Sequence, residues 1–126
     1  MGLRMGTYSS KVVLHAGATT EAVGETFVLN PEGNSTEQEN IEGAFETLVV
    51  QITGVTAGVI AFQANVDGTN WASVSLTDMD DNSTESATVT NANGLFILKN
   101  CKGLAQFRAN VTTHTTGTFV ITAMAG

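Results

Sequence analysis

The sequence predicts an all-β protein, an antiparallel two-sheet β-sandwich of the jelly-roll kind with about eight or nine strands. Short runs rich in β-branched and aromatic residues recur along the chain, and Gly, Asn or Asp closes one about every eight to twelve residues. No segment carries the apolar stripe of an amphipathic helix, although the acidic stretch 37–46 could hold one or two turns. The 126 residues, 42% of them hydrophobic, suffice for one domain with one core.

The expected strands follow this rhythm. We place them near residues 10–16, 21–29, 45–53, 58–66, 70–77, 85–90, 94–99, 104–111 and 117–124. The clearest alternation lies in 104–111, where the inward-facing residues are Ala105, Phe107, Ala109 and Val111. In 117–124 the apolar residues Phe119, Val120 and Ile121 are contiguous, so this strand is expected to be covered on both faces or to pair with another subunit.

The connections between the strands are rich in turn residues. Asp67-Gly68 separates two strand patterns, which is a strong hairpin signal, and Asn93-Gly94 opens the next run. The stretch 30–43 is long for a loop in a compact domain, so it is either an interaction element or an acidic surface loop. Residues 1–9 lie outside the strand rhythm. We therefore expect a flexible N-terminal arm over 1–9 and a single β-sandwich domain over 10–126.

The charge of the chain excludes several classes of function. Twelve acids against five bases give a net charge of −7, and the bases are too few and too scattered to neutralise many phosphates, so no nucleic-acid partner is expected. No apolar run approaches the roughly 18 residues of a membrane span, so no membrane partner is expected. The single Cys excludes an internal disulfide, and the first residues lack the apolar stretch of a signal peptide, which predicts synthesis in the cytoplasm.

The charges are also unevenly distributed. Seven acids fall between residues 21 and 46 and four between residues 78 and 85, whereas residues 86–126 contain none. With Lys99, Lys102 and Arg108, this last stretch has a local charge of +3. The sequence therefore predicts a polarised protein with one docking face and one solvent face.

No residue pattern predicts catalysis, and we expect neither an enzyme nor a cofactor. Asp78, Asp80 and Asp81 could hold a hard cation, but their spacing does not match a calcium loop and favours a solvated hairpin. His15 and His114 have no second ligand at zinc-binding spacing. The chain has no nucleophile elbow and no Gly-rich loop before a helix. A carboxylate pair that only folding brings together, as in glycoside hydrolases, stays open.

The aromatic residues argue against a typical sugar-binding surface. Trp71 and Tyr8 are the only Trp and Tyr in the chain, whereas such a surface normally offers several aromatic platforms. Trp71 follows the Asp-Gly turn at the start of a strand, so we expect it to cap the core beneath that turn. A carbohydrate-binding module remains an alternative.

The second half of the chain resembles a known group of proteins. The segment 62–74 contains Asp67-Gly68-Thr69-Asn70-Trp71 between two strand patterns and is similar to the Asp-Gly-Thr-x-Trp signature of small β-sandwich virion proteins of tailed bacteriophages. The Gly-aromatic strand at 93–98, the strand at 103–111 with Arg108, and the Gly-Thr strand at 116–121 extend the resemblance over residues 58–126. The resemblance implies a structural virion component.

Within that group, the small size and acidic charge favour a head decoration, or cement, protein. Such a protein would bind the phage major capsid protein from outside as a homotrimer, and its location would be the capsid surface of the virion. The alternatives are another phage structural domain, of a head fibre, tail or baseplate, and the carbohydrate-binding module. The residues expected to contact the capsid or a second subunit are Arg4, Tyr8, Pro31, Glu37, Glu39, Lys99, Lys102 and Arg108.

Overall fold

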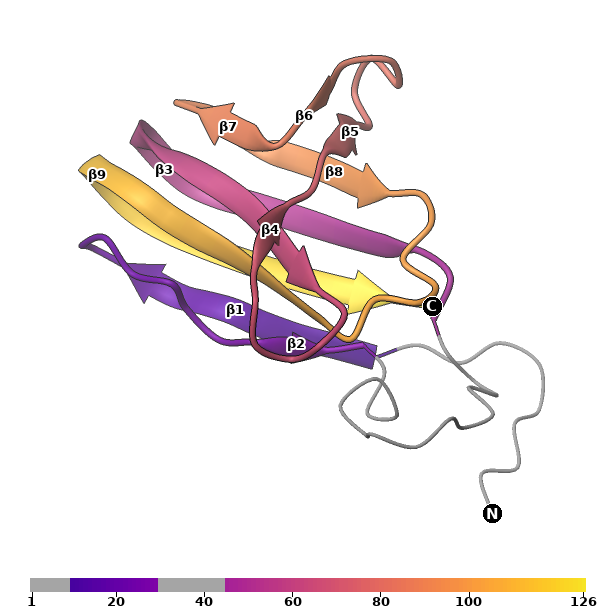
Figure 1. Ribbon diagram of the computed structural model, residues 1–126. Helices are drawn as coiled ribbons and strands as arrows, with labels where there is room; N and C mark the ends of the chain where they lie inside the picture. Colours follow the sequence, from indigo (N-terminus) through magenta and orange to yellow (C-terminus); the bar gives the residue numbers. More distant parts are fainter. Residues whose placement is uncertain (1–9, 30–44) are drawn as a thin grey trace.

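The computed structural model describes residues 10–29 and 45–126, and within these ranges every regular element is a β-strand (Figure 1). The strands are β1 (Ser10–Ala18), β2 (Phe27–Val28), β3 (Leu48–Asn65), β4 (Ala72–Ser73), β5 (Leu76–Asp78), β6 (Glu85–Ser86), β7 (Thr88–Thr90), β8 (Gly94–Leu98) and β9 (Gln106–Ala125). The all-β, antiparallel prediction is confirmed for this part of the chain.

The strands form one hydrogen-bonded sheet that does not close on itself. Its order is β1-β9-β3-β8-β5-β6, while β2 pairs with β9, and β4 and β7 pair with β3. The division into two sheets in a jelly-roll arrangement therefore stays a prediction. Figure 1 shows β3 and β9 as a long twisted pair at the centre, with β1 along one side and β8 along the other.

The two central strands are twice as long as the sequence predicts. The expected strands 45–53 and 58–66 are both parts of β3, and 104–111 and 117–124 are both parts of β9. The expected breaks are β-bulges, where the register of the β3–β9 pair shifts between Thr53 and Ile60. Pairing resumes beyond them because glycines allow the two backbones to approach closely at the bulges. A Cβ on Gly54 would overlap the carbonyl oxygen of Thr118, and a Cβ on Gly117 would overlap the carbonyl oxygen of Gly54.

Three of the shorter expected strands also need correction. The stretch 21–29 contains only β2 and an isolated bridge between Ala22 and Val111. The stretch 70–77 divides into β4 and β5, and 85–90 divides into β6 and β7. These two divide because the chain changes neighbour: β4 and β7 pair with β3, whereas β5 and β6 pair with each other.

The core lies on one side of the sheet and is built around phenylalanines. Phe62 is completely buried, and its ring centroid lies 6.1 Å from that of Phe107 on β9 and 6.0 Å from that of Phe96 on β8. The predicted inward residues of 104–111 are all buried, which confirms that alternation. In the final segment, Phe119 and Ile121 are buried but Val120 between them is only half-buried, so the two faces of this strand are not equally covered.

Candidate functional site

The outward side of β1, β9, β3 and β8 is an apolar surface. Residues directly opposite each other in an antiparallel sheet share a face, so the register defines its rows. One row contains Lys11, Met124, Val49 and Ile97, and the next contains Val13, Thr122, Gln51 and Leu95. Together with Val120, these residues are called the apolar face below. Its most exposed large hydrophobic side chains are Met124 (48%), Leu95 (44%) and Val13 (43%).

The size of the apolar face limits what it can do alone. With strands about 4.8 Å apart and same-face residues about 6.8 Å apart along each strand, its nine residues cover roughly 300 Å². Patches of about 300–600 Å² are the largest on typical monomers and are often functional. A standard protein–protein interface buries about 800 Å² on each partner. One apolar face therefore provides less than half of such an interface.

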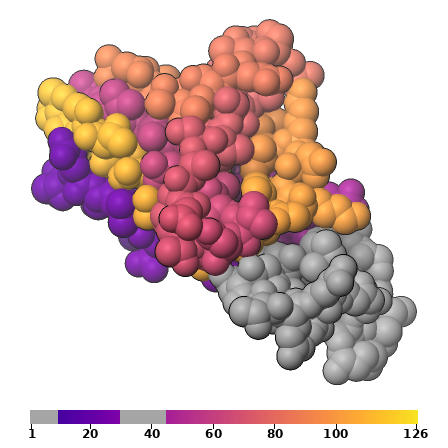
Figure 2. Space-filling view, in the orientation of Figure 1, coloured from indigo at the N-terminus to yellow at the C-terminus, as the bar shows by residue number. Residues whose placement is uncertain are grey.

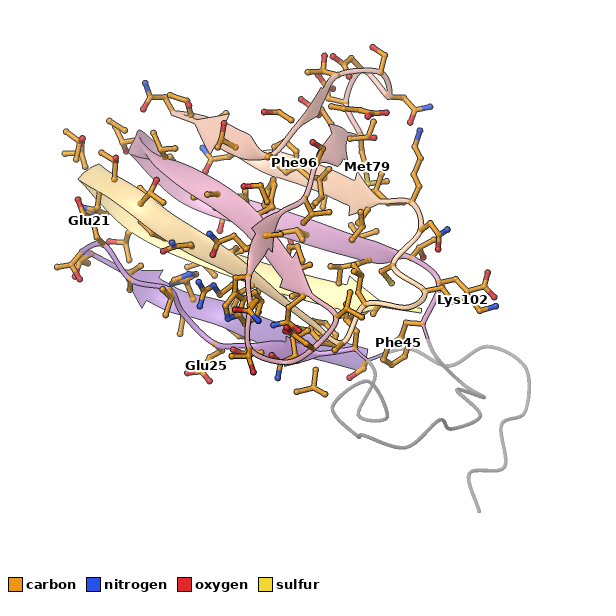
Figure 3. All side chains as sticks on the ribbon, viewed as in Figure 1. Glu21, Glu25, Phe45, Met79, Phe96 and Lys102 are labelled. Atoms are coloured by element: carbon orange, nitrogen blue, oxygen red, sulfur yellow. The ribbon has the colours of Figure 1, made fainter. Side chains whose placement is uncertain are left out.

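The charge of the apolar face sets it apart from the rest of the chain. It contains Lys11 but no acid, although the whole chain carries twelve acids. Five of its residues come from the acid-free stretch 86–126, which the sequence predicts to form a docking face. Figure 3 shows two of the acids, Glu21 and Glu25, on the segment that follows β1. The row that contains Ile97 continues through Thr77 on β5 to Glu85 on β6, so the first acid in that row lies two strands beyond the apolar face.

Farther along β9 and β3, on the other side of the bulges, the outward side of the sheet becomes polar. The Nε of Arg108 donates a hydrogen bond to the Oε1 of Gln63 on β3 at 2.7 Å. The guanidinium carbon of Arg108 lies 4.2 Å from the centroid of the Trp71 ring, a cation–π contact. Beside this pair, the Nδ2 of Asn65 donates to the Oε1 of Gln106 at 2.9 Å. We call these five residues, with Asn110, the polar face.

The Asp-Gly turn places Trp71 on the polar face. One oxygen of Asp67 accepts the backbone N–H groups of Thr69 and Asn70, both at 2.8 Å, and the other accepts the Asn70 amide at 2.7 Å. These bonds lower the pKa of Asp67 to about 2, and the bond from the Asn70 backbone N–H makes the largest contribution. The predicted hairpin is confirmed, and it connects β3 to β4. Trp71, however, is half-buried against Arg108 and is not part of the core cluster, so the expectation that it caps the core is wrong.

The predicted contact residues fall in three places. Arg4, Tyr8, Pro31, Glu37 and Glu39 lie outside the described residues. Lys99 and Lys102 are exposed in the loop between β8 and β9, where Lys102 projects outward in Figure 3, whereas Arg108 lies on β9 itself. The sequence pattern does not predict the apolar face, because its exposed apolar residues come from different strands and only the strand register brings them together. The alternation of Val120, Thr122 and Met124 was the available signal.

The acidic hairpin uses its carboxylates to hold its own loop. Asp78 accepts the backbone N–H of Asp80 at 2.9 Å, and Asp81 accepts those of Ser83 and Thr84, both at 3.0 Å. The Thr84 hydroxyl also donates to Asp81, and this bond is the main reason that the pKa of Asp81 is lowered to about 2. Figure 2 shows this loop projecting from the molecule.

The other candidate chemical groups lie apart. The ring of His15 is buried, with Nε2 at 2.6 Å from the carbonyl oxygen of Ala109, whereas Nε2 of His114 lies 2.6 Å from that of Gly117. Cys101 is a buried free thiol. Among residues 10–29 and 45–126, no group of three His, Cys, Asp or Glu is placed to hold a metal ion. The same ranges contain no helix long and apolar enough to cross a membrane.

Two solved structures have a fold similar to that of this chain. No family model matches the chain, and no curated protein matches it. The solved structure of the SPBc2 prophage-derived protein YomS is similar, with a TM-score of 0.77, 21% sequence identity and 98% of each chain covered. The chain shares the fold of YomS. The PBSX exported protein XepA is also similar, with a TM-score of 0.78 and 15% identity over 98% of this chain, which spans 39% of XepA.

Proposed function

We propose that the chain is a structural protein of a tailed bacteriophage that binds the outside of the capsid as a decoration protein. The observation that carries the proposal is the apolar face, which is exposed, contiguous across four strands and free of acids. The phage assignment is supported by the Asp-Gly-Thr-x-Trp hairpin and by the fold shared with YomS, a prophage-derived protein. The protein is then made in the host cytoplasm and ends on the capsid surface, with no catalytic role.

The size of the face explains why such a protein would act as an oligomer. Burial of the roughly 300 Å² of the apolar face, in which six of the nine residues are apolar, contributes at most about 7 kcal/mol. Association costs about 4–15 kcal/mol in lost translational and rotational freedom. A single copy therefore binds weakly, whereas a homotrimer on a repeating lattice binds through several faces at once. The partner surface on the major capsid protein would be apolar with an acidic rim that complements Lys11.

Two other functions have observations in their favour. XepA is described as an exported protein, which favours a role away from the capsid. The polar face, with its Trp71–Arg108 contact, favours the carbohydrate-binding alternative. A head fibre, tail or baseplate position would use the same apolar face against a different virion protein.

The location of the protein tests the proposal directly. Particles of the phage that encodes the chain are purified and separated into intact virions, isolated heads, isolated tails and particle-free medium, and each fraction is probed with an antibody to the protein. We expect the signal in virions and isolated heads. A signal confined to tails or to particle-free medium would refute capsid decoration and favour the corresponding alternative.

Binding by variants tests the role of the apolar face. Purified protein is added to heads that lack it, and the bound amount is measured after sedimentation. We expect Leu95→Lys and Met124→Lys to reduce binding at least about tenfold, because each replaces an exposed apolar side chain of the face with a charge that the partner would bury. Val66→Lys is the matched control, since Val66 is 64% exposed but lies outside the apolar face. Equal binding by all three variants would exclude the apolar face as the contact.

A further inference from the structure

Arg108 is held in a fixed orientation that leaves most of its hydrogen-bonding capacity unused. A guanidinium has five N–H donors; in Arg108 the Nε group is bonded to Gln63, and the guanidinium carbon lies over the Trp71 ring. Within the described ranges, the terminal nitrogens of Arg108 have neither a hydrogen-bond acceptor nor a carboxylate partner. Every buried polar side-chain atom in these ranges has a partner, so the unpaired nitrogens of Arg108 are not buried. The four remaining N–H groups are therefore open to solvent. Their orientation is set before any ligand arrives, which lowers the entropic cost of binding.

The charge of the surroundings indicates which anion fits. The planar fork of a guanidinium pairs with two oxygens of a carboxylate or a phosphate. Arg108 is the only cation of the polar face, and Lys99 and Lys102 lie in the preceding loop. A phosphate monoester with nearly two charges is usually bound by several cations, whereas a carboxylate needs one. The nearby acid, Asp67, directs both of its oxygens into its own turn.

The neighbouring amides extend the site beyond a single carboxylate. The side-chain oxygens of Gln63 and Gln106 already accept hydrogen bonds from Arg108 and Asn65, so their NH₂ groups remain as donors toward the face. Such donors suit the hydroxyl oxygens of a sugar, and the part of the half-buried Trp71 ring that Arg108 does not cover offers an apolar surface for its C–H groups. We propose that the polar face binds an acidic sugar of the hexuronate type, with Arg108 pairing with its carboxylate. This inference does not depend on capsid binding.

The fluorescence of Trp71 provides a direct test, because it is the only Trp in the chain. The intact protein is titrated with glucuronate, with glucose and with inorganic phosphate at constant ionic strength. We expect a saturable change with glucuronate, at least about tenfold weaker binding of glucose because the charged hydrogen bonds are lost, and weaker binding of phosphate. A response to glucose equal to that of glucuronate, or tighter binding of phosphate, would overturn the proposal.

Variants of the polar face show whether Arg108 is responsible. Arg108→Gln should abolish the saturable response, and Arg108→Lys should weaken it, because an ammonium lacks the planar fork. Gln63→Glu should also abolish it while preserving the melting temperature, since the new carboxylate pairs with Arg108 within the protein. Lys102→Gln, which removes an exposed loop cation, is the control and should titrate like the unchanged protein. Unaltered glucuronate binding by folded Gln63→Glu protein would refute the site.

Discussion

Gly54 should tolerate no side chain, because the bulge in β3 brings its Cα against the carbonyl group of Thr118 on β9. Gly54 has a φ of +80°, and a Cβ there would overlap the Thr118 oxygen. The left-handed conformation costs an alanine about 1–2 kcal/mol. Displacement of the opposite β9 backbone adds about 1–3 kcal/mol, as other overpacking substitutions do. Gly54→Ala should therefore lose about 2–5 kcal/mol of unfolding free energy.

Gly103 provides the matched control. Its φ is +98°, but a Cβ there would have nothing within 4 Å. Gly103→Ala should lose only the conformational part, about 1–2 kcal/mol. For a domain of this size, one kcal/mol changes the melting temperature by roughly 4 °C, so thermal unfolding followed by circular dichroism should separate the two variants by several degrees. Equal melting temperatures would show that the β3 and β9 backbones are not in close contact at the bulge.

Three further predictions concern the core, the hairpin and the thiol. Phe62→Ala should lower the unfolding free energy measured in urea by about 3–5 kcal/mol, because it removes a fully buried ring that contacts Phe96 and Phe107; a loss below about 1 kcal/mol would contradict this packing. The pKa of Asp67 is lowered from 3.8 to about 2 in the folded protein, so its stabilising contribution is complete above pH 3.8 and is lost as the pH falls toward 2. Asp67→Asn should therefore melt with a weaker pH dependence in that window, and a carboxyl titration by NMR with a midpoint near 3.8 would contradict the hairpin geometry. Burial raises the pKa of the Cys101 thiol, so a disulfide reagent at pH 8 should label the native protein much more slowly than the urea-unfolded protein, and equal rates would show that the thiol is accessible.

The alternation of buried and outward-facing residues in 104–111 could be predicted because it is visible within one short stretch of sequence. Phe107 and its inward neighbours are buried by the core and Arg108 faces away, so burial on one side leaves a period of two in the sequence. The continuity of β3 and β9 could not be predicted in the same way. Glycine is typical of turns, so Gly54 and Gly117 suggest that a strand ends at each of them. Only their contact across the sheet shows that pairing continues past them.

The candidate surfaces were predictable only in part. The acid-free C-terminal stretch supplies much of the apolar face, as the charge distribution indicates. Val13, Leu95 and Met124 come from three strands, however, and only the pairing register places them in adjacent rows. The position of Trp71 after a tight turn predicts that it caps the core. Its ring instead covers Arg108, because β4 lies alongside the part of β3 that presents Gln63 to the same arginine.

The central position of β9 has a consequence for the order in which the protein folds. Both β1 and β3 pair with β9, and the β3–β9 partners range from Asn65 with Gln106 to Leu48 with Ala125. During synthesis, β1 and β3 therefore leave the ribosome before the strand that lies between them exists. Contacts this distant in sequence make folding slow, and unpaired strands are prone to aggregate in the interval. Residues 1–105 carry four bases and twelve acids, and their net charge of −8 would keep the nascent chains apart until β9 arrives.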